Sequence, residues 1–281
     1  MKTIWVLENI REHNSFYNKF DLLMMFASVI QWKKHHPSFH THVFLDKLTY
    51  DTFSRIGALE LWDSYENLPT GKSIDKNVFW ASSKLVALRS IEEPIVIMDN
   101  DFVVYKSFEN FLKDKIVATL YEDGRGYYAN PLNPYIKKVK HIINRPKTEA
   151  LNCSFLYFPD YKFTQYYAKT SIELMEEFTK LKVPDSTYLI YAEQLLLKHL
   201  INLHKIEYDT LLDKEFLCSK KIYTKERPGL INTESHNLYF RHYWMEKPDI
   251  RANKKGFSYS EEITQLENIV NNRILLEWDK L

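Results

Sequence analysis

The sequence predicts an α/β protein in which a mostly parallel central sheet is flanked by helices. Short apolar runs alternate along the chain with longer segments whose apolar residues recur at helical spacing. The chain has 281 residues and is 45% hydrophobic, which is enough for one large buried core. We therefore expect a single domain over residues 1–281 that ends in a C-terminal helical extension, residues 251–281.

The first part of the chain alternates between expected strands and helices. The expected strands are residues 3–7, 41–45, 58–61 (a weak one), 94–98 and 102–105. The expected helices are residues 15–34, 50–56 and 77–91. This alternation is typical of parallel strands joined by helices on both faces of a sheet.

The second part of the chain continues the pattern after a long interruption. We expect strands at 116–120 and 153–158, and helices at 163–181 and 188–203. Residues 121–146 contain glycines, prolines and tyrosines and read as a long loop, which is a lid or binding segment, a disordered segment, or a site of extra helices. The last helix starts at a capping box, Ser258-x-x-Glu261, and extends to Ile274.

Composition excludes several classes of function. The 38 basic and 37 acidic residues nearly cancel, so no nucleic-acid partner is expected. The two cysteines, Cys153 and Cys218, lack a C-x-x-C spacing, which fits a reducing compartment and argues against a zinc site. There is no run of eighteen apolar residues and the first seven residues do not form a signal peptide, so we expect a cytoplasmic protein without a transmembrane segment.

Two carboxylates follow the apolar run 94–98 in the motif Asp99-Asn100-Asp101. Carboxylates are costly inside a sheet unless they are paired or bound to a metal ion. At the carboxyl end of a parallel strand they can hold Mn²⁺ or Mg²⁺ beside a ligand crevice. The chain has only 6 glycines, so a glycine-rich phosphate loop is not expected and a metal ion is the better partner for a diphosphate.

The acidic motif and the segment that precedes it resemble a known family of enzymes. The run Phe79-Trp80-Ala81-Ser82-Ser83-Lys84-Leu85, followed by Ile95-Val96-Ile97-Met98-Asp99-Asn100-Asp101, resembles the donor half of a GT-A nucleotide-sugar glycosyltransferase. The resemblance implies that Asp99 and Asp101 bind the metal ion, and that Asn100 and the basic residue Lys84 face the sugar diphosphate.

Three further segments are similar to the family-8-like branch, which includes glycogenin and bacterial galactosyltransferases. The first is 151–158, where Asn152 would lie beside the donor sugar and Ser154 stands where a glycine is usual. The second is 191–195, where the resemblance implies that Glu193 and Gln194 lie near the transferred sugar.

The third segment, 240–248, resembles a C-terminal histidine followed by Lys-Pro. The resemblance implies that His242 completes the metal shell and that Lys247 neutralises the leaving phosphate. The spacing is one residue shorter than usual and Met245 replaces a glycine, so His236 is a rival ligand. At the end of the first strand, Glu8 and Asn9 are candidates for hydrogen bonds to the nucleotide base and ribose.

The resemblance implies a metal-dependent hexosyltransferase of carbohydrate biosynthesis. It would use Mn²⁺ or Mg²⁺ and a nucleotide diphosphate sugar, of which a UDP-sugar is the favoured donor. The acceptor would be a hydroxyl of a glycan, protein or small molecule. Residues 1–120 would form the nucleotide and donor half, and 121–250 the sugar and acceptor half. Retention of the anomeric configuration follows by analogy; an inverting enzyme would need Glu193 or a carboxylate from Tyr121-Glu122-Asp123 as general base.

Two other classes of function remain. A nucleotidyltransferase acting on a sugar phosphate also binds a metal ion at strand ends, but typically has a glycine-rich N-terminal loop, and 7–16 contains none. A non-catalytic carbohydrate-binding protein would use some of the 19 Tyr, 17 Phe and 6 Trp as stacking surfaces, although most of these lie in apolar runs typical of a core.

Overall fold

The computed structural model describes residues 1–8, 18–69, 74–123, 134–143, 149–211, 239–243, 247–254, 258–270 and 272–278. The chain divides into two compact units. Through their described residues, unit 1 takes Met1–Asn67, Met98–Asn110 and Glu215–Leu281, and unit 2 takes Leu68–Ile97 and Phe111–Lys214. Among these residues no helix is both long enough and apolar enough to span a membrane.

Unit 1 is built on three parallel strands, β1 (Lys2–Leu7), β2 (His40–Leu45) and β3 (Ser64–Asn67), with β1 and β2 in register from Lys2 opposite His40. Helix α1 (Lys19–His35) connects β1 to β2, while α2 (Lys47–Arg55) and the 3-10 turn η1 (Ala58–Leu61) connect β2 to β3. Helix α1 starts at Asn18, whose side chain accepts the Asp21 N–H. The expected alternation of strand and helix is confirmed here.

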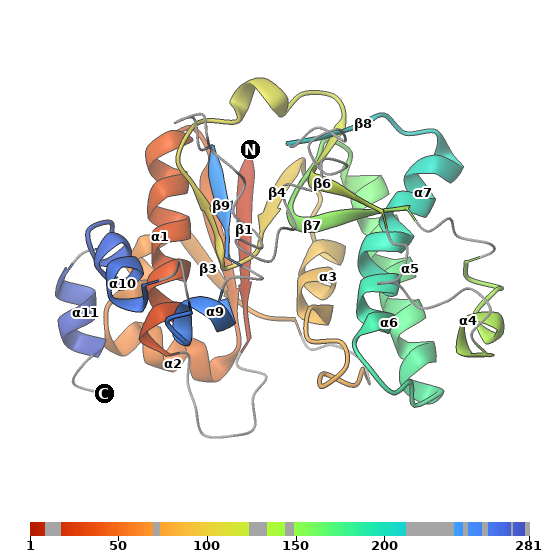
Figure 1. Cartoon of the computed structure of the whole chain (residues 1–281). Helices are drawn as coiled ribbons and strands as arrows, with labels where there is room; N and C mark the ends of the chain where they lie inside the picture. The colour runs from red at the N-terminus through yellow and green to blue at the C-terminus, as the bar shows by residue number, and fades with distance from the viewer. Residues whose placement is uncertain are drawn as a thin grey trace. The chain divides into compact units, whose positions relative to one another are not determined.

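A second, two-stranded sheet of unit 1 consists of β5 (Phe102–Val104) and β9 (Phe240–His242), which pair antiparallel. Buried hydrogen bonds tie it to α1: Ser28 Oγ donates to the Phe102 carbonyl (2.7 Å) and accepts the Trp5 indole N–H (3.0 Å). The C-terminal helices are α9 (Lys247–Arg251), α10 (Tyr259–Glu267) and α11 (Asn272–Trp278), and α10 packs on α1 (Figure 1). Ser28 of α1 thus links β5 to β1 through two buried hydrogen bonds.

Unit 2 contains the strands β4 (Ile95–Met98), β7 (Glu149–Phe158), β6 (Ile116–Asp123) and β8 (Tyr208–Thr210), in that order. Strand β6 pairs antiparallel with β7 and parallel with β8. Its helices are α3 (Ser82–Arg89), α4 (Pro134–Lys138), α5 (Tyr161–Lys180), α6 (Thr187–Ile190) and α7 (Leu196–His204). The π-helical turn η3 (Tyr191–Leu195) lies between the last two. The 3-10 turn η2 (Glu109–Phe111) precedes β6 in the chain, and its first two residues belong to unit 1. The predicted α/β class, with mostly parallel strands flanked by helices, is confirmed.

One expected strand is wrong. Residues 58–61 form the 3-10 turn η1, and the third strand of unit 1 is β3, at Ser64–Asn67. Gly57 has φ +72°, a left-handed conformation that turns the chain after α2, and the Trp62 N–H then bonds the Leu59 carbonyl (3.2 Å). Strand β3 has mostly exposed side chains, so apolar content could not reveal it.

Two expected helices differ in extent. The helix expected over 77–91 is only α3, because Asp75 accepts the Asn77 N–H in a side-chain turn and the helix starts at Ser82. The C-terminal helix begins at the expected cap, where Ser258 Oγ accepts the Glu261 N–H (3.3 Å), but it divides into α10 and α11. The intervening segment is rich in asparagine, which favours turns over helix interiors. In the long expected loop, β6 continues to Asp123 and α4 is an extra helix.

Candidate metal and sugar-nucleotide site

The Asp99-Asn100-Asp101 segment is a tight connection between β4 and β5. The Phe102 N–H bonds the Asp99 carbonyl (3.1 Å), which closes a turn and starts β5 directly after Asp101. The side-chain amide of Asn100 donates to the Val6 carbonyl (3.4 Å). Since Val6 lies near the carboxyl end of β1, and β1 is parallel to its neighbour β2, the loop sits at the edge of unit 1 where such folds bind ligands.

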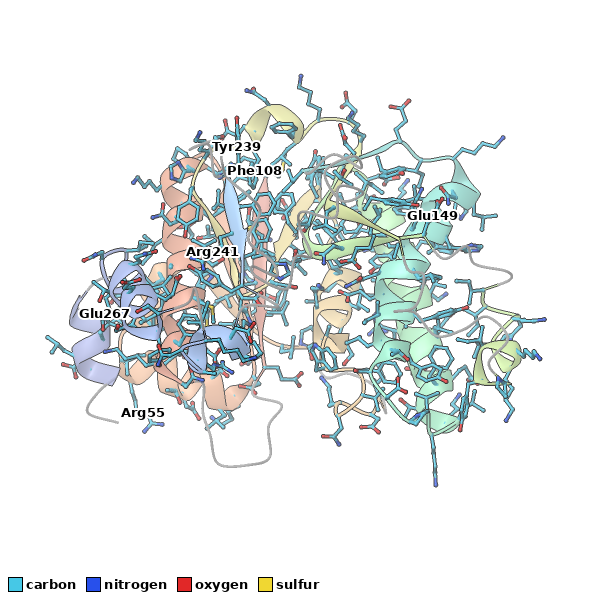
Figure 2. The ribbon with its side chains drawn as sticks, in the orientation of Figure 1. Arg55, Phe108, Glu149, Tyr239, Arg241 and Glu267 are labelled. Atoms are coloured by element: carbon cyan, nitrogen blue, oxygen red, sulfur yellow. The ribbon has the colours of Figure 1, made fainter. Side chains whose placement is uncertain are left out.

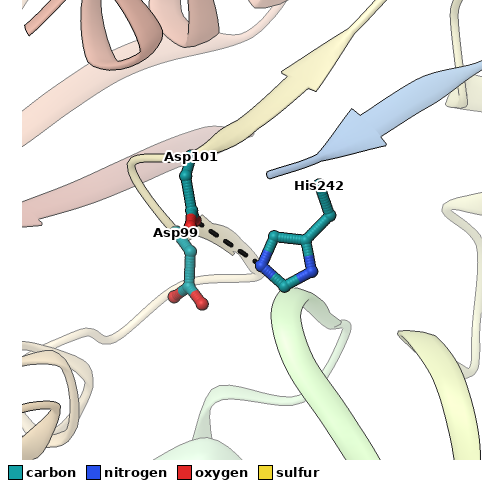
Figure 3. A group of neighbouring side chains, drawn as sticks. All are labelled: Asp99, Asp101 and His242. Carbon is teal, nitrogen blue, oxygen red and sulfur yellow. Dashed lines mark ion pairs between the residues drawn. The ribbon is translucent and has the colours of Figure 1, made fainter. Parts of the chain in front are cut away.

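His242 reaches this loop through the pairing of β5 with β9. It lies opposite Phe102 in the register, and the N–H of the next residue, Tyr243, bonds the Asp101 carbonyl (3.1 Å). One ligand atom from each of Asp99, Asp101 and His242 lies within 4.8 Å of the others, and Figure 3 shows the Asp101 carboxylate directed at the imidazole. This is the metal-ligand set expected from the sequence, and β9 brings its distant member to the other two.

The geometry of the group fits a hard divalent cation. Asp101 is buried, Asp99 and His242 are half-buried, and Nε2 of His242 lies 3.5 Å from Oδ1 of Asp101. Oxygen ligands about 2.0–2.1 Å from Mg²⁺ are about 3 Å apart when adjacent and about 4 Å apart when opposite. Ligand atoms up to 4.8 Å apart would therefore have to close by up to about 2 Å to become adjacent ligands of an ion of this size. Two carboxylates and one imidazole also suit Mn²⁺.

Lys247, the first residue of α9, lies beside the same carboxylate. Its Nζ is 2.6 Å from Oδ2 of Asp101, and its side chain is 28% exposed, so it also meets solvent. Burial alone would raise the pKa of Asp101, but the charges of Lys247 and His242 and their hydrogen bonds hold that pKa well below its ordinary value. Asp101 is therefore an anion at neutral pH, as a metal ligand must be.

Lys84 and Glu193 form a buried ion pair within unit 2. The Nζ of Lys84 lies 2.6 Å from Oε1 of Glu193 and donates to the Cys153 carbonyl (3.0 Å). The two side chains are only 9% and 6% exposed. Sequence reasoning selected both residues separately and missed that they bind each other. The signal was available, because a lysine and a glutamate on apolar helix faces must find partners when buried.

Glu193 and Gln194 sit in the π-helical turn η3, which interrupts the helix expected over 188–203. Helix α5 supports this turn: Tyr167 Oη donates to the Glu193 carbonyl (3.2 Å), and Ser171 Oγ donates to the Ala192 carbonyl. A π turn widens the backbone ladder and is frequently found at functional sites. Neither Tyr167 nor Ser171 was expected to take part, because the sequence pattern does not distinguish a π turn from an α-helix.

Asn152 on β7 belongs to a hydrogen-bonded network in unit 2. Its amide donates to Glu122 Oε1 (2.9 Å), and its Oδ1 accepts from the Ser154 hydroxyl (2.6 Å) and the Ser154 N–H (3.1 Å). The Ser154 hydroxyl also bonds Thr119 on β6 (2.7 Å). The serine that replaces the usual glycine thus orients Asn152, and Glu122 is a partner that the sequence did not predict.

The remaining expected residues divide between described and undescribed parts of the chain. Glu8 is half-buried and directly follows β1. Asn9 and His236 lie outside the described residues. Unit 1 brings together Asp99, Asn100, Asp101, His242 and Lys247, and unit 2 brings together Lys84 and Glu193.

Comparisons with known proteins find one family match. Residues 1–243 match DUF6734, described as a family of unknown function. No curated protein matches the chain.

Several solved structures are similar at low identity. The glycosyltransferase GlyE of Streptococcus pneumoniae TIGR4 is 12% identical; its apo form aligns with a TM-score of 0.46 over 86% of this chain and 54% of GlyE. A second GlyE structure aligns with a TM-score of 0.41 over 76% of this chain and 45% of GlyE. The galactosyltransferase LgtC, in complex with donor and acceptor sugar analogues, is 12% identical with a TM-score of 0.41 over 68% of this chain and 70% of LgtC. The chain thus spans about half the length of GlyE.

Proposed function

The chain belongs to DUF6734, a family of unknown function, and we propose that it is a metal-dependent glycosyltransferase that uses a nucleotide diphosphate sugar. The observation that carries the proposal is the group Asp99, Asp101 and His242, with Lys247 paired to Asp101 at the carboxyl end of β1. The donor we favour is a UDP-sugar, and the acceptor is a hydroxyl of a glycan, protein or small molecule.

Three side chains would hold the metal ion. The carboxylates of Asp99 and Asp101 and the imidazole of His242 present one ligand atom each. A bound Mn²⁺ or Mg²⁺ supplies positive charge that stabilises the diphosphate as it leaves. Lys247 contributes a second cation whose 28% exposure lets it turn from Asp101 towards a phosphate oxygen. Asn100 would bind the nucleotide. Glu8 and Asn9 would also bind it, an assignment that rests on their position after the first strand.

By the sequence resemblance alone, residues that lie in unit 2 would bind the sugar of the donor. Glu193 and Gln194 on η3 and Asn152 on β7 offer carboxylate and amide groups for donor hydroxyls. The Glu193 carboxylate, which lies 2.6 Å from the Lys84 ammonium, would also stabilise positive charge that develops at the anomeric carbon. We propose transfer with retention, following the family-8-like resemblance, with no separate nucleophile required.

The proposal is tested by incubating the protein and Mn²⁺ with a panel of nucleotide sugars and detecting released nucleotide. We expect turnover with at least one donor and its loss in Asp101→Ala, while far-UV circular dichroism stays unchanged. Asp51→Ala is the matched control, because among the described residues the Asp51 side chain pairs with the exposed Lys47 on α2, away from the metal group. Wild-type turnover in Asp101→Ala would overturn the site.

Calorimetry with Mn²⁺ separates the alternatives. A glycosyltransferase binds UDP, whereas a nucleotidyltransferase prefers a nucleoside triphosphate. A protein that only binds carbohydrate gives no heat with either nucleotide.

A further inference from the structure

A buried ion pair connects the strand that carries His242 to the C-terminal helix α10. The guanidinium of Arg241 on β9 donates to both carboxylate oxygens of Glu262 on α10, each at 2.9 Å (Figure 2 labels Arg241). Both side chains are 12% exposed. Such a bidentate contact has a fixed geometry, so it neutralises the Arg241 charge and also constrains the position of the strand.

The pair acts on the face of β9 opposite to the metal ligands. Side chains alternate along a strand, so Arg241 and Tyr243 share one side while His242 points to the other. The Arg241 guanidinium stacks 4.3 Å from the centre of the Tyr243 ring, and that ring meets Phe20 of α1 edge-on at 6.0 Å. Glu262 therefore holds a stack that packs β9 against α1.

Strand β9 and the following residue, Tyr243, also make the contacts that place His242 beside Asp101. His242 lies opposite Phe102, and the Tyr243 N–H bonds the carbonyl of Asp101 (3.1 Å). A shift of β9 would therefore move the imidazole relative to the carboxylates. Removing either side chain breaks the two hydrogen bonds that hold β9 to α10, and the strand then loses that constraint on its position.

We propose that Glu262 is a positioning residue for the metal centre, acting through Arg241 and β9 on His242. The inference rests on the proposed metal site and extends it to α10, which lies beyond the residues that match the family. The segment after residue 243 would then help to set how tightly this chain binds its metal ion.

The test measures Mn²⁺ affinity directly, by electron paramagnetic resonance of free Mn²⁺ well below the melting temperature. We expect Glu262→Gln, which keeps the shape but not the charge, to weaken binding by up to about tenfold, the low end of the loss for groups bonded directly to a ligand, because Glu262 acts through Arg241. Arg241→Lys keeps the charge but not the fork and should also weaken binding. The double variant should bind Mn²⁺ no more weakly than the single variant with the lower affinity, because both changes disrupt the same contact.

Glu267→Gln is the matched control. Glu267 is on the same helix and pairs with Lys19 of α1 at 2.7 Å, but that pair is a third exposed and does not involve Arg241. Its Mn²⁺ affinity should equal that of the wild type.

Two outcomes would overturn the inference, and they are distinguishable. If the wild type binds no Mn²⁺, or Asp101→Asn binds it equally well, the metal site itself is wrong. If the wild type binds and Asp101→Asn does not, but Glu262→Gln and Arg241→Lys both keep wild-type affinity, only the role of Glu262 is wrong. Thermal melting of each variant identifies any that fails to fold, and Arg241→Lys then decides in place of Glu262→Gln.

Discussion

The ammonium of Lys247 lies 2.6 Å from one oxygen of Asp101, while the imidazole of His242 lies 3.5 Å from the other. One carboxylate thus faces a cationic side chain and a candidate metal ligand at the same time. Lys247 and a divalent ion would therefore compete for negative charge at Asp101, and they would cooperate only once a diphosphate is present to bind both.

This competition leads to opposite effects in Lys247→Met. Without the ammonium, Mn²⁺ alone should bind several-fold more tightly, because a like charge a few ångströms away is removed. Release of nucleotide from the donor should fall about tenfold or more, because the leaving phosphate loses a cation. Titration of Mn²⁺ without donor and steady-state turnover with donor check the two halves. Weaker Mn²⁺ binding would show that Lys247 only supports the structure of the site.

His242→Ala should leave the two carboxylates in place and remove one ligand. We expect the Mn²⁺ concentration for half-maximal activity to rise about tenfold, within the range reported for loss of groups around a metal ion. His236→Ala is the comparison variant and should keep the wild-type requirement. An unchanged requirement in His242→Ala together with a raised one in His236→Ala would move the ligand role to His236.

The buried pair of Lys84 and Glu193 should affect stability separately from activity. Lys84→Met leaves the Glu193 carboxylate buried without its cation, which should cost about 3–5 kcal/mol of unfolding free energy. The double variant Lys84→Met/Glu193→Leu should recover most of that loss, because an apolar pair needs no compensation. Urea unfolding measures both changes. Additive losses in the double variant would contradict the pairing, and nucleotide release should be low in both variants.

His36 should make stability depend on pH. Its Nε2 accepts the Phe108 N–H (2.7 Å) and its ring stacks on Trp32, and burial lowers the pKa of His36 from 6.5 to about 4. Between those two pH values the unfolded chain takes up a proton that the folded chain excludes, so unfolding free energy falls as pH drops from 6.5 to about 4. This contribution is fully present above pH 6.5 and is worth up to about 3 kcal/mol.

His36→Gln is the control for this prediction. Its amide oxygen can accept the same N–H but does not titrate, so its unfolding free energy should vary less over this window. Burial alone would raise the pKa of Asp63, but hydrogen bonds from Lys33 and Thr41 lower it from 3.8 to about 2. Asp63 therefore affects the unfolding free energy only at lower pH. Equal pH dependence in wild type and variant would assign the effect to other groups.

Much of the fold was predictable because its signals are local. The strand before Asp99-Asn100-Asp101, the helix α1 and the cap at Ser258 follow from apolar spacing and from side chains that bond their own backbone. The turn η1 and the strand β3 were not predictable, since Gly57 redirects the chain and β3 exposes most of its side chains. The π turn η3 has the apolar spacing of an ordinary helix.

The sequence by itself determined the α/β class, the acidic motif and the candidate metal ligands, because each depends on residue type and on order along the chain. Only the tertiary structure decided which distant side chains meet. The pairing of β5 with β9 brings His242 to Asp101, helix α9 brings Lys247 to the same carboxylate, and burial couples Lys84 to Glu193 and Arg241 to Glu262. These contacts join residues far apart in the chain. A buried charge is stable only when an opposite charge lies beside it, and only the fold determines which residue that is.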